Sequence, residues 1–170
     1  MRFPIVSSLC AAVMLLSGCA GYHLGPANGV VAGEKSIEIL PFNNQTLEPR
    51  LGDAVDQAVR ENMQTDGTYR LVSHGGSDVV LTGTLNRFYR EGLSFLNHDV
   101  ATTENYRVGL VAHVVVRDGN SGKVLLEKDI TGFTLVRVGS DLASADRQSQ
   151  SLLAEDLARN ITVALTEGSW

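Results

Sequence analysis

The sequence is poor in cysteine, with two among 170 residues, and both lie near its start, at Cys10 and Cys19. The rest of the chain has no thiol, which excludes a disulfide framework or a cysteine-based zinc site there. The four histidines share no metal-ligand spacing, and no phosphate-cradling loop of the G-x-x-x-x-G-K type is present. The sequence therefore predicts no metal and no cofactor, and packing alone must stabilise the fold.

An excess of positive charge is also lacking. The formal net charge is −5, from 14 basic and 19 acidic residues. An acidic chain gains no long-range attraction to nucleic acid, so we expect no nucleic-acid partner. Any anion that it binds must be held by a local group of basic side chains.

No apolar run is long enough for a membrane-spanning helix. The most apolar stretch, residues 3–16, follows Arg2 and is too short to cross a bilayer. It leads into Leu16-Ser17-Gly18-Cys19, which resembles the lipobox of bacterial lipoproteins. We predict that residues 1–18 are a signal peptide and that Cys19 is acylated, with palmitate among its lipids. The alternative is an ordinary signal peptide with an incidental cysteine.

The residues after the cysteine predict where the protein is held. Ala20 stands where an aspartate would favour retention in the inner membrane, so the outer membrane is the expected destination. Bacterial lipoproteins carry three acyl chains, and each buried methylene contributes about 0.8 kcal/mol, which makes such an anchor effectively permanent. Residues 19–35 are rich in Gly, Ala and Asn and are predicted to form the lipidated N-terminus and tether. Residues 36–168 are predicted to form a single domain.

Hydrophobic periodicity predicts the elements of that domain. Two stretches have apolar residues at helical spacing, and the others alternate as strands do. The predicted strands are residues 36–40, 69–72, 78–89, 106–117 and 123–136, and the predicted helices are residues 48–64 and a segment from Asp141 or Ser144 to just before Gly168. The first helical stripe is Leu51, Val55, Ala58, Val59 and Met63, and the second is Leu142, Leu152, Leu153, Leu157, Ile161 and Leu165. Asp156 lies off the second stripe, so Asp156→Ala is expected to be nearly silent.

This order of elements predicts an α+β fold. Each helix has one apolar stripe and needs a surface to cover, and the simplest solution places both on one face of a sheet. We expect a two-layer sandwich with a mixed, mostly antiparallel four-stranded sheet, in which the first strand, helix and next strand form a right-handed crossover. The other face is left open at Val111 and Val115. Such a face is either solvent-tolerant or an interaction surface.

Several segments in this order resemble one family. They are G-C-A-G-Y at 18–22, I-E-I-L-P-F-N-N-Q-T at 37–46, D-V-V-L-T-G-T-L at 78–85, Y-R-V at 106–108, Asp118, and G-K-V-L at 122–125. Together they resemble the lipopolysaccharide-assembly lipoproteins of the LptE type. The resemblance implies a two-helix, four-stranded sandwich that plugs the lumen of the outer-membrane β-barrel LptD. It further implies that the protein assists delivery of lipopolysaccharide (LPS) to the outer leaflet.

Contact with LPS requires basic residues near phosphate, and arginine is best suited to grip it bidentately. The family places such residues on loops at one end of the sheet, but residues 91–105 and 138–146 contain no Lys or Arg. The candidates nearby are Arg87, Arg90, Arg137 and Arg147. Arg87 and Arg90 converge only if the strand bulges or ends before Arg90, and in an antiparallel meander Arg87 or Arg90 would meet Arg137 at one edge of the sheet. Otherwise each is a separate solvated charge.

Catalytic and other functional patterns are weaker. Residues 73–78, S-H-G-G-S-D, contain a hydroxyl, an imidazole and a carboxylate, but neighbours in sequence do not orient one another as a triad. We interpret this stretch as a turn and the protein as not an enzyme. Two alternative functions are a lipoprotein that activates a periplasmic enzyme, which the short tether disfavours, and a ring-forming secretion-channel component. The second is disfavoured by His113 and by Glu127, Lys128 and Asp129 on a predicted lipid face.

Overall fold

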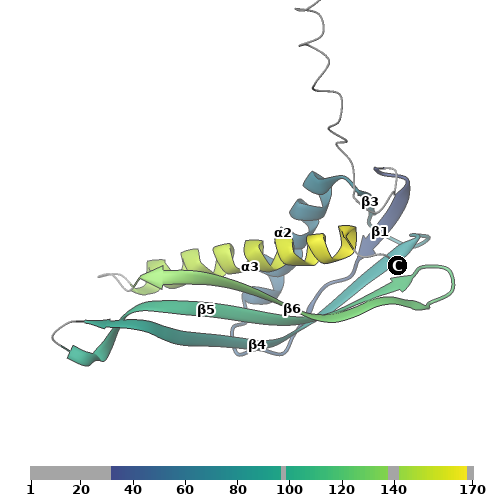
Figure 1. The fold of residues 1–170 in the computed structure, drawn as a ribbon. Coiled ribbons are helices and arrows are strands. Elements are labelled where there is room, and N and C mark those ends of the chain that lie inside the picture. The colour runs from purple at the N-terminus through teal and green to yellow at the C-terminus, as the bar shows by residue number, and fades with distance from the viewer. Residues whose placement is uncertain (1–31, 97–98, 138–141, 168–170) are drawn as a thin grey trace, which may run out of the picture.

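A computed structural model describes residues 32–96, 99–137 and 142–167 (Figure 1). The predicted signal peptide, residues 1–18, and the predicted lipidation site, Cys19, lie outside the described residues. The last part of the predicted tether is described, and there the backbone N–H of Gly33 donates to the carbonyl of Thr68 at 3.0 Å. The contacts of the domain therefore include residues before the predicted boundary at residue 36.

The described residues form two helices and six strands. In chain order they are β1 (Lys35–Ile39), β2 (Asn43–Asn44), α2 (Leu51–Asp66), β3 (Tyr69–Val72), β4 (Val79–Leu96), β5 (Asp99–Asp118), β6 (Val124–Arg137) and α3 (Leu142–Thr166). Neither helix, within the described part of the chain, combines the length and apolarity needed to cross a membrane.

One mixed sheet contains all six strands, in the order β3-β1-β4-β5-β6, with β2 paired to β4 beside β1. β1 pairs in parallel with β3 and β4, whereas β4, β5 and β6 form an antiparallel meander. Both helices lie on one side of the long strands, and no described element covers the other side (Figure 1). The predicted α+β two-layer sandwich is thus confirmed, although the sheet has six strands and not four.

β2 and the far end of the long hairpin were not predicted, and each has a physical reason. β2 is two asparagines, and its residues carry no apolar alternation. β3 coincides with the predicted extended segment 69–72, which the expected four-stranded sheet did not include. β4 and β5 continue past the core as a hairpin whose strands pair out to Leu96 and Asp99. From residue 86 to residue 93 no residue of β4 is buried, so burial imposes no period-two pattern on that part of the strand.

α2 forms where its apolar stripe predicts, and all five residues of that stripe are buried. It ends at Gly67, whose φ of 73° is the left-handed conformation that glycine adopts readily at a helix C-terminus. Polar side chains of α2 hold the segment after β1. Asp56 accepts a hydrogen bond from the N–H of Phe42 at 2.8 Å, and Arg60 donates to the carbonyl of Ile39. Burial raises the pKa of Asp56 above its usual value, although the N–H of Phe42 and the charge of Arg60 oppose the shift.

The hydrophobic core lies between the helices and one face of the sheet. From β5 it takes Val108, Leu110, Ala112, Val114 and Val116, which alternate along the strand as predicted. From α3 it takes Leu153, Leu157, Ile161 and Leu165, which are all fully buried. Leu152, predicted for the same stripe, is 45% exposed, and the side chain of Leu142 lies outside the described residues.

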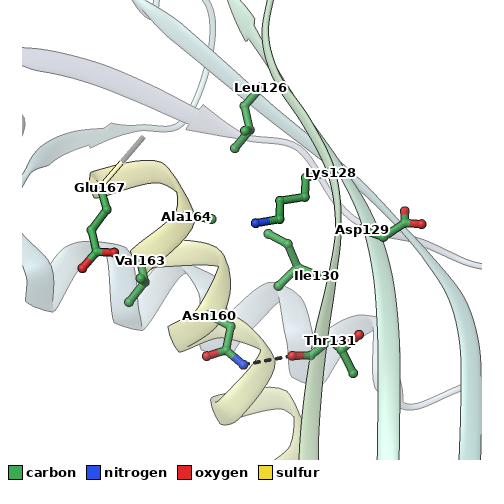
Figure 2. Close-up of a pocket in the computed structure, with 9 residues that line it drawn as sticks. All are labelled: Leu126, Lys128, Asp129, Ile130, Thr131, Asn160, Val163, Ala164 and Glu167. Carbon is green, nitrogen blue, oxygen red and sulfur yellow. Dashed lines mark hydrogen bonds between the residues drawn. The ribbon is translucent and has the colours of Figure 1, made fainter. Parts of the chain in front are cut away.

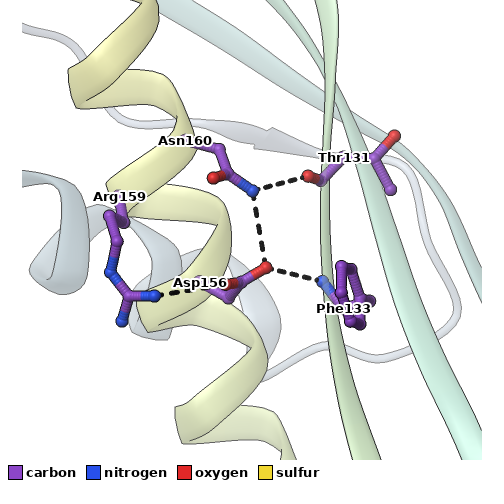
Figure 3. A network of polar contacts seen from close by, with 5 residues as sticks. All are labelled: Thr131, Phe133, Asp156, Arg159 and Asn160. Atoms are coloured by element: carbon purple, nitrogen blue, oxygen red, sulfur yellow. Dashed lines mark hydrogen bonds and ion pairs between the residues drawn. The ribbon is translucent and has the colours of Figure 1, made fainter.

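α3 meets the outer strand β6 through polar side chains (Figure 3). Asp156 accepts a hydrogen bond from the N–H of Phe133 at 3.0 Å, and Asn160 donates to the carbonyl of Thr131 at 2.9 Å. Both backbone groups point away from β5, so the helix satisfies part of an otherwise free sheet edge. Because the carboxylate of Asp156 bonds to the sheet, the structure replaces the expectation of a nearly silent Asp156→Ala with that of a measurable loss of stability.

Gly132 allows this close contact. A Cβ atom at that position would lie 2.5 Å from the backbone nitrogen of Leu157 and 2.7 Å from its Cα. These are main-chain atoms of a helix and have no rotamer that would move them aside. The path of α3 over β6 therefore depends on the absence of a side chain at residue 132.

Candidate functional site

The sheet face that points away from the helices is uncovered in the described structure. The strand register determines which side chains lie next to one another on this face. Tyr89, Gly109 and Phe133 are direct neighbours across β4, β5 and β6. The Tyr89 ring occupies the space above Gly109, because a Cβ there would lie 2.2 Å from the ring carbon Cζ. Phe133 is 52% exposed. Two aromatic rings thus lie in one row across the open face.

Two arginines stack on these rings. The guanidinium carbon of Arg87 lies 5.2 Å from the centre of the Tyr89 ring, and that of Arg107 lies 5.5 Å from the centre of the Phe133 ring. Such contacts contribute roughly 0.5–1 kcal/mol at exposed sites and restrict the arginine side chains. A guanidinium held over a ring face uses no N–H group in that contact, so its N–H groups are able to donate to an anion.

We call this surface the arginine–aromatic band: Arg87, Tyr89, Arg107, Phe133 and Leu135. Leu135 lies opposite Arg107 on β6 and is 63% exposed. Arg107 also approaches Glu91 at 3.8 Å, an exposed ion pair that contributes little to stability. The band therefore combines exposed apolar surface with two cations on a chain whose net charge is negative.

The predicted anion-binding arginines are not brought together. In β4 the register shift falls between Leu85 and Arg87, and pairing is regular from Arg87 to Gly92. Alternation therefore places Arg87 on the open face and Arg90 on the helix-covered face. Arg90 lies 5.3 Å from the centre of the Phe88 ring and 3.9 Å from a carboxylate oxygen of Glu48.

Arg137 follows Phe133 and Leu135 at alternate positions of β6 and pairs with Asn105, which puts it on the open face. Of the two predicted combinations, Arg90 with Arg137 is excluded because these residues belong to opposite faces, whereas Arg87 shares the open face with Arg137. Arg147 lies in α3, and its side chain is outside the described residues. Arg107 was not among the candidate residues, and its contact with the Phe133 ring depends on a register that the sequence does not specify.

The other end of the open face is acidic. His113 Nδ1 lies 2.8 Å from Asp129, and its Nε2 lies 3.3 Å from Glu127. The hydrogen bond that His113 makes to Asp129 is the main cause that raises the pKa of His113 above its usual value, and Glu127 adds to the shift. Glu127 and Asp129 therefore lie towards the β5–β6 turn, where the exposed Arg117 shares the open face, whereas Arg87 and Arg107 lie towards the hairpin, with Glu91 beside Arg107. No group of three or more metal-ligating side chains occurs within the described ranges.

The S-H-G-G-S-D segment is a turn, as predicted. Gly75 and Gly76 have φ values of 52° and 76°, and His74 is exposed. Asp78 accepts hydrogen bonds from the backbone N–H and the hydroxyl of Ser36, at 2.8 and 2.6 Å. These bonds lower the pKa of Asp78 and tie the start of β4 to β1. The carboxylate thus has a structural partner, so nothing here supports a role in orienting His74.

Comparison with known proteins decides the family. A family model for lipopolysaccharide assembly, LptE, matches residues 34–165, well over half of the chain. The chain belongs to the LptE family. LptE proteins are non-enzymatic LPS-assembly lipoproteins of the cell envelope. No curated protein matches the chain in sequence.

Solved structures confirm the fold of this LptE-family chain. A lipoprotein from Caulobacter crescentus is 14% identical, with a TM-score of 0.53 over 74% of this chain and 87% of that one. A protein from Chlamydia trachomatis is 10% identical, with a TM-score of 0.58 over 82% and 98%. The minor lipoprotein of Acinetobacter baumannii is 14% identical, with a TM-score of 0.52 over 78% and 92%. At such identities the similarity concerns the fold alone.

Proposed function

We propose that this protein is an outer-membrane lipoprotein, anchored through Cys19, that associates with the β-barrel LptD and assists LPS assembly. The observation that carries the proposal is the family match over residues 34–165. The protein would face the periplasm or insert into the barrel lumen. Family membership favours this function over enzyme activation or a secretion channel.

The shape and polarity of the open face support such an association. Barrel interiors are lined by polar side chains, so a domain that enters one requires a surface of mixed polarity. The open face carries charges of both signs, with Arg87 and Arg107 towards the hairpin, Glu127 and Asp129 towards the β5–β6 turn, and the half-buried Val111 and Val115 between them. A partner surface whose charges complement these positions would bind it in one orientation, because like charges would meet in the reverse orientation.

The arginine–aromatic band is the part of this face suited to LPS. Phosphate groups on the lipid would accept hydrogen bonds from Arg87 and Arg107, and Phe133 and Leu135 offer apolar surface beside them. Arg137 lies further along the same face and is proposed as an additional contact. Arg90 is bound on the other face and is not part of the proposed surface.

Charge reversal in the band tests this assignment. Arg87→Glu combined with Arg107→Glu should weaken binding of purified protein to LPS by tenfold or more, because each charge-assisted hydrogen bond contributes roughly 1.5–3 kcal/mol. Binding is measured by fluorescence titration at fixed salt. The control, Arg70→Glu with Arg117→Glu, changes the net charge equally at exposed arginines outside the band. Equal losses in both double variants would mean that net charge acts and the band does not.

A further inference from the structure

β6 is the outer strand of the meander, and its outward backbone groups are only partly satisfied. The Phe133 N–H and the Thr131 carbonyl point away from β5 and bond to α3. In an antiparallel strand every second residue directs its N–H and carbonyl to the same side, so those of Asp129 and Glu127 also point outward. Among the described residues, none bonds to the outward backbone groups of these two.

A groove opens beside these free groups. Asn160 makes the last described hydrogen bond from α3 to the edge of β6, and beyond it a groove of about 480 Å³ opens between the two elements (Figure 2). Its walls include Leu126 and Ile130 from β6 and Val163 and Ala164 from α3. Val163 is 42% exposed. The groove therefore presents an apolar wall next to an unpaired strand edge.

Lys128 gives the groove a charge. Figure 2 shows its amine directed across the groove towards Ala164, whereas the carboxylate of Glu167 points away from it. No carboxylate lies within 4.0 Å of Lys128 in the described part of the chain. Its neighbours Glu127 and Asp129 are on the opposite face, where they contact His113. Asp129 and Glu167 also line the groove, but within the described residues neither forms an ion pair with Lys128.

We propose that this groove binds an extended segment of another protein, which adds as a further strand along Glu127–Thr131 and places an acidic side chain at Lys128. Free N–H and carbonyl groups at every second residue match a peptide backbone. An acyl chain would cover the apolar wall of the groove, but it would leave the backbone N–H and carbonyl groups of β6 without a hydrogen bond. Apolar side chains of the added strand would pack on Val163 and Ala164.

The charge of Lys128 would also prevent the free edge of β6 from pairing with strands that carry no acidic residue at that position. An entirely apolar strand would enclose its ammonium group without a counter-ion, and inward-directed charges are a common protection of sheet edges. A strand with a carboxylate at that position would remove the penalty. The same side chain therefore excludes most partners and selects one class. This interaction is independent of LPS binding and lies on the side of β6 away from β5.

Photo-crosslinking with matched edge variants tests the proposal. A photoreactive phenylalanine analogue replaces Val163 in the full-length protein in its native cells, and mass spectrometry identifies the adducts. Glu127→Pro removes an outward N–H that bonds to nothing within the fold, at an edge position where proline is tolerated. Glu127→Ala removes the same carboxylate and keeps the N–H. Lys128→Glu reverses the groove charge, and Lys128→Arg preserves it.

We expect an adduct with an extended peptide segment that contains Asp or Glu. Its yield should remain within about twofold in Glu127→Ala and Lys128→Arg and fall about tenfold or more in Glu127→Pro and Lys128→Glu. The proposal would be overturned if only lipid adducts formed or if no peptide adduct appeared. It would also be overturned if Glu127→Pro and Glu127→Ala gave equal yields. If thermal melting shows that Glu127→Pro is unfolded, the comparison of Lys128→Glu with Lys128→Arg tests the proposal in its place. Equal adduct yields in these two variants would refute the proposal.

Discussion

Leu157→Asp is expected to unfold the protein or to reduce its free energy of unfolding by about 4 kcal/mol or more. The side chain of Leu157, on the sheet-facing side of α3, is fully buried. Removal of a buried leucine costs roughly 2–5 kcal/mol, and an aspartate there adds the cost of a carboxylate without a partner. Because domains of this size have only about 5–15 kcal/mol of stability, most of it would be lost. Urea unfolding followed by circular dichroism measures the change.

The same helix provides the control. Leu152→Asp makes the same chemical change at a side chain that is 45% exposed, and it should cost less than about 1 kcal/mol. Asp156→Ala should fall between the two, at roughly 1–3 kcal/mol, because it leaves the N–H of Phe133 without its acceptor. Equal effects of Leu152→Asp and Leu157→Asp would show that the buried face of α3 has been assigned wrongly.

Gly132→Ala is expected to destabilise the protein by about 2–3 kcal/mol, although it adds a single methyl group. The new Cβ would lie 2.5 Å from the backbone nitrogen of Leu157, so helix and strand must separate. Separation would also weaken the bonds from Asp156 and Asn160 to β6. Hydrogen exchange at the Phe133 amide, which Asp156 protects, should accelerate along with the loss of stability.

Gly52→Ala is the matched control for this substitution. Gly52 lies in α2, and a Cβ there would make an ordinary contact of 3.5 Å with Asn44. Alanine is favoured over glycine in a helix by about 0.8–1 kcal/mol, so this variant should be as stable as the wild type or more stable. If Gly132→Ala behaved in the same way, the close approach of α3 and β6 would not exist in solution.

Local periodicity was sufficient to predict the elements that border the core. The stripe of α2 and the alternation of β5 each have one buried face, and burial imposes a period that is visible in the sequence. The turn at residues 73–78 was predicted, and Gly75 and Gly76 within it have the positive φ that glycine adopts readily. Segments without buried residues, such as β2 and residues 86–93 of β4, leave no such pattern.

The candidate site was less predictable, because it depends on register and not on periodicity. Arg87 and Arg90 were singled out for their proximity in sequence, yet alternation separates them onto two faces. Arg107 and Phe133 are far apart in sequence and meet because β5 and β6 pair with Gly109 opposite Phe133. The role of Asp156 depends equally on where α3 crosses β6. One-sequence reasoning has no information about such contacts between elements.

The central claim is a stoichiometric association with a β-barrel, and co-purification from outer membranes tests it most directly. The tagged full-length protein is extracted in mild detergent, and its partners are quantified by mass spectrometry against an untagged control. We predict that one large outer-membrane β-barrel, LptD, accompanies the protein in an equimolar amount. Recovery of the protein alone, as a ring of its own copies, or with a periplasmic enzyme in place of a barrel would contradict this account.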